Sequence, residues 1–238
     1  QHAILDPDEL ERERAVVIQE INQAHDTPDD IIFDYFQETA YPNQAMGWPV
    51  LGSTALIKDL KQETLLKFMQ EQYAGNRIVL AAAGKVKHDK LVKLARDTLT
   101  KLPTQSLSAT EPPIYVSGDY REHRDLEQLH LIMGFDGLSY VDVEYYPMAV
   151  LSTLLGGGMS SRLFQEARER RGLVYSIYTF VSNYKDSGLF GIYAGTGSNE
   201  IAKLVPVICG EIKSICDKVT EGELTRARAQ LKSSTIMA

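Results

Sequence analysis

The chain of 238 residues is short of cysteine, of long apolar runs and of basic charge, and each shortage excludes a class of protein. Its two cysteines, Cys209 and Cys216, stand seven positions apart, which on a helix is roughly 10 Å and too far for a disulfide bond. A disulfide-stapled fold is therefore excluded. No apolar run reaches the ~18–20 residues that span a bilayer. Acidic residues outnumber basic ones by 32 to 25, and the net charge of -7 argues against nucleic acid or an anionic membrane as the main partner.

What is present has the balance of an ordinary globular protein. Hydrophobic residues make up 44% and charged residues 24% of the chain, which argues against disorder and low-complexity assemblies. The length allows one large domain or two small ones. No basic segment followed by an apolar one opens the sequence, so no secretory leader is visible, and the first residue is Gln1 rather than methionine.

Hydrophobic periodicity predicts a mixture of helices and strands without regular alternation, which is typical of an α+β fold with mainly antiparallel pairing. Helices are predicted over about 6–23, from 28, and over 53–60, 62–73, 88–102, 145–155, 160–171, 199–219 and 222–237. Strands are predicted over 77–83, 114–120, 128–135, 173–183 and 188–196. The stretch 103–113, rich in Pro, Ser and Thr, is the best candidate for a linker.

One internal similarity suggests that the chain begins and ends at the same point of a tandem repeat. E-L-E-R-E-R-A at 9–15 resembles E-L-T-R-A-R-A at 223–229, so the repeat is 214 residues long (223 − 9). A chance match between two charged helices is the alternative. If the repeat is real, residues 1–102 are the back part of one domain, 103–113 the linker, and 114–238 the front part of a homologous second domain.

Two carboxylates share a face of the first predicted helix. Glu13 and Glu20 are seven positions apart, which at about 100° per residue leaves them about 20° apart, beside apolar residues such as Val16 and Val17. The ordinary interpretation is that they lie at the edge of the apolar stripe and reach water or an arginine. The alternative is a metal ligand or a general acid/base, because buried carboxylates are usually paired or metal-bound. We expect both to point into a groove.

The E-R-E-R-x-V-x-x-x-E pattern ending at Glu20 resembles the glutamate helix of the pitrilysin-type, or inverted-zincin, zinc metallopeptidases, which include the processing peptidases of mitochondria and insulin-degrading enzyme. The nearest likeness is to bacterial proteins that resemble the mitochondrial processing peptidase. The resemblance also includes 33–35, 41–42, 51–52, 78–84, 156–164, 172–175 and 184–189, and so covers nearly the whole chain. It implies metallopeptidase-type domains in which a mainly antiparallel sheet is covered by helices.

Zinc in this family is held by the two histidines of an H-x-x-E-H motif and one downstream glutamate. The resemblance implies that Glu20 is that third ligand and that Glu13 is the second, supporting glutamate of the catalytic site. This chain has no H-x-x-E-H, because none of its five histidines lies four positions from another. In the family the motif precedes the glutamate helix. We therefore expect zinc in the full-length protein and none bound by this chain alone.

The second half contains the residues that the resemblance assigns to substrate. The run Gly156-Gly157-Gly158 lacks the following Lys and Ser/Thr of a phosphate-binding loop, so a helix stop is one interpretation and a substrate-contacting glycine loop the other. Arg168 and Tyr175 match an arginine and a tyrosine that reach toward the substrate from the second domain. Both could donate hydrogen bonds to a peptide carbonyl or a developing oxyanion. The alternative is an ordinary exposed Arg and a strand Tyr.

The sequence thus predicts part of a zinc-dependent metalloendopeptidase that processes peptides or presequences, inactive as this fragment alone. The alternative is a non-catalytic peptide-binding or scaffold subunit of the same family. The expected partners are a peptide or unfolded polypeptide substrate and a second subunit in a homodimer or heterodimer, with no nucleic acid and no membrane span. A cytoplasmic location in a bacterium is favoured, with the periplasm and the mitochondrion as alternatives.

Overall fold

The computed structural model describes residues 3–100, 102–104 and 111–237, which form two compact units. The first unit comprises Gln1–Gln23 and Val50–Glu111, and the second comprises Ala24–Pro49 and Pro112–Ala238. The predicted linker at 103–113 lies largely outside the described residues. In this division residues 24–49 group with the second part of the chain, and the boundary between two homologous domains stays a prediction.

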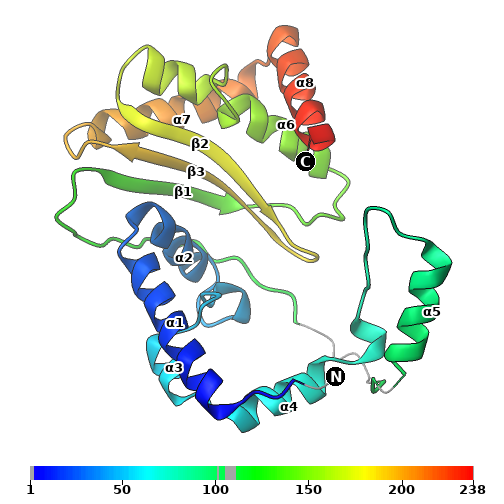
Figure 1. The fold of residues 1–238 in the computed structure, drawn as a ribbon. Helices are drawn as coiled ribbons and strands as arrows, with labels where there is room; N and C mark the ends of the chain where they lie inside the picture. The colour runs from blue at the N-terminus through cyan, green and yellow to red at the C-terminus, as the bar shows by residue number, and fades with distance from the viewer. Residues whose placement is uncertain (1–2, 101, 105–110, 238) are drawn as a thin grey trace. The chain divides into compact units, whose positions relative to one another are not determined.

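The first unit is helical in its described residues (Figure 1). Its elements are α1 (Pro7–His25), whose last two residues lie in the second unit, α3 (Thr54–Asp59), α4 (Gln62–Gln72), the 3₁₀ turn η2 (Gly75–Arg77) and α5 (His88–Thr98). Polar contacts join its segments: Arg14 donates to the carbonyls of Lys58 and Leu60 at 3.1 and 2.9 Å, and the Gln62 amide to Leu5 at 2.6 Å. Helices α3, α4 and α5, all described in full, bury none of their residues.

Two strand predictions were wrong. Residues 77–83 form no strand, and Val79 is 92% exposed. Residues 114–120 form no strand either, and the Val116 amide donates to the carbonyl of Ala40 at the end of α2 (2.9 Å). A strand exists only when a neighbour accepts and donates its backbone hydrogen bonds, and the described residues supply no such neighbour to either segment.

The second unit is built on a three-stranded antiparallel sheet. Its strands are β1 (Leu129–Asp136), β2 (Val174–Asn183) and β3 (Gly188–Thr196), in the order β1-β3-β2. Its helices are α2 (Pro28–Ala40), the 3₁₀ turn η1 (Ala45–Gly47), α6 (Tyr145–Gly156), the π-helical turn η3 (Phe164–Glu169), α7 (Ile201–Asp217) and α8 (Glu221–Met237). The predicted α+β class with antiparallel pairing is confirmed.

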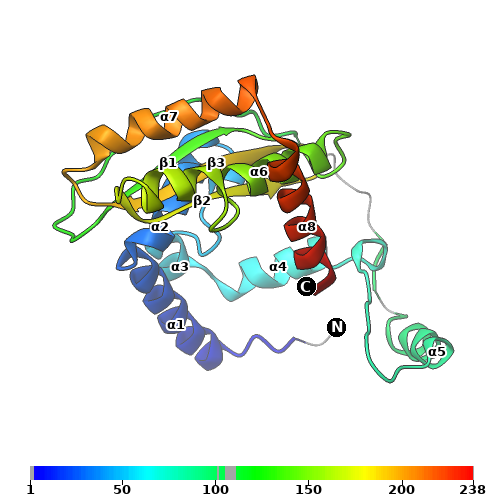
Figure 2. The same ribbon diagram turned by 90° about the horizontal axis from the view of Figure 1, so that it is seen from above.

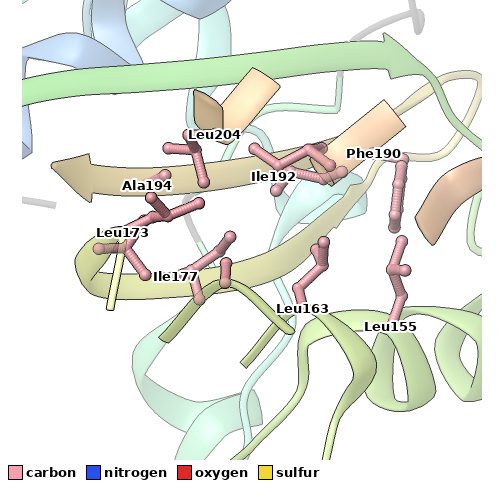
Figure 3. Packing of buried hydrophobic residues seen from close by; sticks show 11 residues of the cluster. Leu155, Leu163, Leu173, Ile177, Phe190, Ile192, Ala194 and Leu204 are labelled. Atoms are coloured by element: carbon pink, nitrogen blue, oxygen red, sulfur yellow. The ribbon is translucent and has the colours of Figure 1, made fainter. Parts of the chain in front are cut away.

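The main core lies between the sheet and the helices α6 and α7, which Figure 2 shows over the strands. Figure 3 shows the side chains that fill it. The labelled members are Leu155, Leu163, Leu173, Ile177, Phe190, Ile192, Ala194 and Leu204. The central strand β3 is buried along its whole length. At about 1.5–3 kcal/mol for each large apolar side chain, this burial is the principal stabilising term of the unit.

Helix α2 covers the opposite face of the same sheet (Figure 1). The ring of Phe33 meets Phe180 edge-on at 5.1 Å and stacks on Tyr193 at 5.8 Å, and Phe36 meets Phe180 at 6.0 Å. Such aromatic pairs add to the apolar burial at each contact. This packing explains why residues 24–49 belong to the second unit, although they follow the glutamate helix in sequence.

Candidate active-site residues

Glu13 and Glu20 lie on α1, as the sequence predicted, and both are exposed. The described residues do not enclose them in a groove, and a groove completed by other parts of the longer protein stays a prediction. No group of three or more His, Cys, Asp and Glu side chains that could hold a metal ion occurs among the residues described. The residues present therefore do not make a zinc site by themselves, although Glu20 offers one carboxylate ligand.

The repeat predicted from the sequence would make helix α8 the counterpart of α1. It begins at Glu221, which is 214 residues after the start of α1 at Pro7 (221 − 7), the same separation as in the sequence. The position equivalent to Glu13 is Ala227, which is 4% exposed. The only carboxylates of the predicted site are thus replaced by Ala227 and Ser234 in the second copy. In α8 the position of Glu13 is buried at Ala227, whereas the position of Glu20 is exposed at Ser234.

That neighbour is α6, against which α8 packs. The side-chain amide of Gln230, one turn after Ala227, donates to the Gly157 carbonyl at the end of α6. The part of α8 around Ala227 and Gln230 therefore lies close to the helix that leads into the glycine run. The equivalent of α6 in the first copy would precede residue 1.

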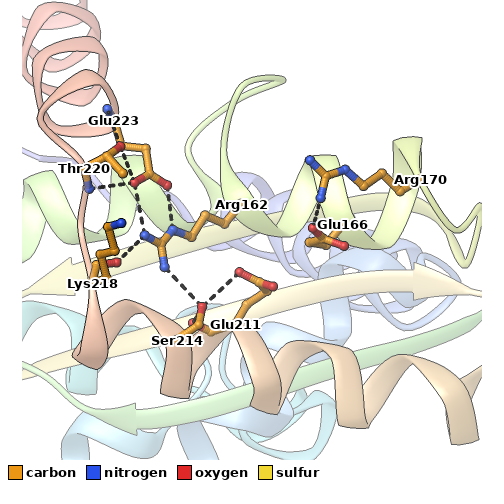
Figure 4. Close-up of polar contacts among 8 residues, drawn as sticks. All are labelled: Arg162, Glu166, Arg170, Glu211, Ser214, Lys218, Thr220 and Glu223. Atoms are coloured by element: carbon orange, nitrogen blue, oxygen red, sulfur yellow. Dashed lines mark hydrogen bonds and ion pairs between the residues drawn. The ribbon is translucent and has the colours of Figure 1, made fainter.

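A capping box and an ion pair fix the start of α8 (Figure 4). Glu223 accepts hydrogen bonds from the amide and hydroxyl of Thr220 at 2.9 and 2.7 Å, and the Glu223 amide donates to that hydroxyl at 3.3 Å. Arg162, from the sequence motif after the glycine run, donates to Glu223 at 2.7 Å and to Ser214 and Lys218. The hydrogen bonds from Arg162 and Thr220 lower the pKa of Glu223 to about 2.

The glycine run at 156–158 is a place of close packing. A Cβ on Gly156 would lie 2.6 Å from the Thr179 backbone nitrogen, and one on Gly157 would lie 2.5 Å from the Thr153 Cα. Neither position has a positive φ, so space rather than backbone conformation requires glycine. A contact with substrate stays a prediction for these residues. Gly156 is buried, whereas Gly157 is exposed.

Arg168 lies in the last residues of the π-helical turn η3, which contains the hydrogen bond from the Arg170 amide to the Gln165 carbonyl (3.0 Å). Single π turns occur frequently at functional sites. Leu163 and Ala167 are fully buried and anchor the turn in the core, which leaves Arg168 exposed. The Arg168 guanidinium carbon lies 4.9 Å from the centroid of the Phe164 ring.

The segment after η3 is capped at Gly172, whose φ of +61° belongs to the left-handed region. Its amide donates to the Arg168 carbonyl at 3.0 Å, and the Leu173 amide donates to Ala167 at 2.8 Å. Leu173 and Val174 are then both buried at 7% exposure. This cap fixes the five residues, 169–173, that lead from Arg168 into β2.

Tyr175 is the residue at which the β2–β3 ladder is irregular. Val174 pairs with Thr196 and Ser176 with Gly195, so Tyr175 has no partner across the ladder. Its side chain is 63% exposed, directly after two buried residues. Bulges of this kind re-aim a side chain and are over-represented next to active sites. The structure makes both Arg168 and Tyr175 accessible to a ligand, and their joint contact with substrate stays a prediction.

Sequence reasoning missed a cavity of about 700 Å³ in the second unit. It lies between α2, β1, the start of α7 and the chain around 115–128, and it contains none of the predicted site residues. At its rim Arg124 donates to Glu122 at 2.8 Å and to the Tyr35 hydroxyl at 3.1 Å. Burial is the main cause, and the nearby Tyr35 the next, that raises the pKa of Tyr120 to about 12. No motif marked these residues, because the cavity forms where distant segments meet.

The histidines do not gather into a site. Among the described ones, His130 contacts the Tyr193 hydroxyl at 2.8 Å, and no second histidine joins it in any metal-binding group within the described chain. No helix in the described parts of the chain has the length and apolar character needed to cross a membrane.

The chain belongs to the M16 peptidase family: the model of the family's inactive domain matches residues 59–231. The resemblance to zinc metallopeptidases drawn from the sequence is confirmed. An uncharacterized zinc protease of Rickettsia felis is 38% identical over all of this chain and 58% of its own length. The beta subunit of the human mitochondrial-processing peptidase is 33% identical, over all of this chain and 51% of its length. The chain thus spans about half the length of these relatives.

Solved structures share the fold. A structure described as the peptidase M16 inactive domain from Pseudomonas fluorescens matches 97% of this chain and 57% of its own with a TM-score of 0.89 at 21% identity. A protease from Helicobacter pylori matches 98% of this chain and 59% of its own with a TM-score of 0.85 at 22% identity. At these identities the likeness concerns the fold alone.

Proposed function

We propose that this chain is part of a zinc-dependent metalloendopeptidase that cleaves peptides or presequences. In the longer protein, Glu20 is a zinc ligand and Glu13 supports the site from the same face of α1. Zinc belongs to the full-length protein, because the described residues contain no complete set of ligands. Residues 1–102 are then the back part of the zinc-carrying domain, and residues from 114 onward the front part of the second domain.

The observation that carries the proposal is the equivalence of α1 and α8. Ala227 takes the place of Glu13 and is buried in the second unit, where α8 packs on α6. If the first copy repeats this arrangement, Glu13 faces the upstream equivalent of α6, and Glu20 lies two turns further along the same face of α1. That is where the family resemblance places the H-x-x-E-H helix. The exposure of the two carboxylates in this chain then has a physical reason, since their partner helix precedes residue 1.

Arg168 and Tyr175 provide the second part of the proposal. Their guanidinium and hydroxyl groups hold a peptide carbonyl of the substrate by hydrogen bonds, and the Tyr175 hydroxyl stabilises negative charge that develops on that oxygen. Both groups are exposed, and a capped turn and a bulged strand fix their backbone. The proposed substrate is a peptide or an unfolded polypeptide.

The experiment uses the longer protein that includes the upstream motif. Tyr175→Phe should reduce turnover of a fluorogenic peptide by about 10²–10³-fold, the usual cost of losing one oxyanion donor, with zinc content and melting temperature unchanged. Tyr178→Phe is the matched control, because Tyr178 is a second exposed tyrosine on β2. Unchanged turnover in Tyr175→Phe would remove Tyr175 from the site.

A second candidate function is a non-catalytic peptide-binding or scaffold subunit. It is favoured by the match to the inactive domain of the family over residues 59–231. The coding sequence upstream of Gln1 separates the two candidates. An H-x-x-E-H motif there supports the enzyme, whereas its absence, together with no zinc in the purified longer protein, supports the subunit.

A further inference from the structure

One arginine, Arg168, lies in the π-helical turn η3, and two more, Arg170 and Arg171, follow directly after it. Arg170 pairs with Glu166, as Figure 4 shows, and Arg171 lies 3.7 Å from the same carboxylate. No carboxylate pairs with Arg168 anywhere in the described ranges 3–100, 102–104 and 111–237. Glu166 is thus occupied by its two neighbours, and Arg168 keeps an uncompensated positive charge.

The structure places an aromatic ring against the Arg168 guanidinium. The guanidinium carbon lies 4.9 Å from the centroid of Phe164, within the ~6 Å range of a cation–π contact. The ring attracts the cation through its electron-rich face and accepts none of the five N–H donors in the guanidinium plane. Phe164 therefore restrains the side chain and leaves its donors available.

Phe164 is in turn held by the core. Its neighbour Leu163 is fully buried, as is Ala167, the neighbour of Arg168. The two core residues are four positions apart, and so are Phe164 and Arg168. Leu163 and Ala167 fix the turn in the core. Phe164 and Arg168 each lie one position after these residues, where Phe164 is half-buried and Arg168 is exposed.

We propose that Phe164 is a positioning residue, whose ring holds the Arg168 guanidinium in the orientation that binds a carbonyl or carboxylate oxygen of a peptide substrate. The inference rests on the proposed function, in which Arg168 contacts substrate. It adds a residue that has no polar atom and no contact with substrate of its own. A long side chain restrained in this way loses less conformational entropy when it binds, which strengthens the complex.

The first test is made on this chain. In ¹H–¹⁵N spectra the Arg168 Nε–Hε signal should carry a ring-current shift from Phe164, identified by its absence in Arg168→Met. Phe164→Leu keeps an apolar side chain but removes the ring, so the signal should move toward the position of an unrestrained arginine. Phe164→Tyr keeps the ring and should leave the signal in place. A signal that does not move in Phe164→Leu overturns the proposal.

The second test uses the longer protein and an internally quenched peptide. Phe164→Leu should raise KM by about two- to fivefold, the range of an exposed cation–π contact, with kcat little changed. Phe164→Tyr should restore the KM, and Phe164→Leu should have no further effect in an Arg168→Met background. Melting temperatures are measured so that all kinetics are recorded below the unfolding transition. A loss of packing alone would change the kinetics in both backgrounds, whereas the positioning role changes them only when Arg168 is present.

The outcomes separate the two proposals. If Arg168→Met raises KM but Phe164→Leu does not, the positioning role is wrong and the proposed function stands. If neither variant changes KM or kcat while the Arg168 signal moves as expected, the contact exists but the substrate role of Arg168 is wrong, and the positioning role falls with it. An equal, additive effect of Phe164→Leu in both backgrounds also overturns the proposal.

Discussion

Glu223→Gln tests how the start of α8 is held to the rest of the second unit. Glutamine keeps the hydrogen-bonding shape of the capping box with Thr220 but removes the charge that pairs with Arg162. The Arg162 and Glu223 side chains are only 14% and 19% exposed, so this pair is better shielded than an ordinary surface pair. The variant therefore measures the ion pair rather than the cap.

The magnitude follows from the pKa of Glu223. A fall from its ordinary value of 4.5 to about 2 corresponds to an upper bound of about 3 kcal/mol, at about 1.4 kcal/mol for each pKa unit. Water still reaches both side chains, and screening reduces this to about 1–2 kcal/mol. We expect the melting temperature of the variant to fall by about 3–6 °C at pH 7.

The pKa of Glu223 also predicts how the stabilisation by the ion pair changes with pH. The pKa of Glu223 is lower in the folded chain than in the unfolded chain, so the stabilisation is complete above the unfolded value of 4.5. It is lost as the pH falls from 4.5 toward about 2, because the unfolded state then binds the proton more readily. The difference in melting temperature between the wild-type chain and Glu223→Gln should therefore shrink over that window.

The assay is thermal unfolding followed by circular dichroism at a series of pH values. Glu221→Gln is the matched control, because Glu221 is exposed and lies in the same first turn of α8, where it experiences the same helix dipole. Equal losses in the two variants, or a difference between wild type and Glu223→Gln that is the same at pH 7 and pH 3, would refute the ion-pair argument.

Two further predictions concern the proposed zinc ligand on α1 and the glycine cap before β2. In the longer protein, Glu20→Gln should lower zinc content and turnover by orders of magnitude. The control Glu11→Gln, on another face of α1, should leave both intact. Full zinc content in Glu20→Gln would remove Glu20 from the ligand set. Gly172→Ala should destabilise the chain by about 1 kcal/mol, because φ is +61° and no atom lies within 4 Å of the added Cβ. Gly172→Asn should cost less, and an equal loss in both would contradict the conformational argument.

Much of the second unit could be predicted from the sequence, because its signals are local. Period-2 and period-3.6 patterns located the strands at 128–135, 173–183 and 188–196 and the helices that cover them, all of which find partners within the described chain. The strands predicted at 77–83 and 114–120 failed for the opposite reason. Their apolar patterns are present, but a strand needs a neighbour for its backbone hydrogen bonds, and the sequence of one segment does not show whether that neighbour is available.

The sequence by itself determined the family, and it supplied the predicted repeat of 214 residues and the candidate residues Glu13, Glu20, Arg168 and Tyr175, because motif spacing can be read along the chain without the fold. Only the tertiary structure decided that α2 joins the second sheet, that Ala227 is buried where Glu13 is exposed, and that a bulge turns Tyr175 outward. Each of these three features depends on which helices and strands pack against each other. Contact between residues distant in sequence is set by packing of the whole core, which no local pattern specifies.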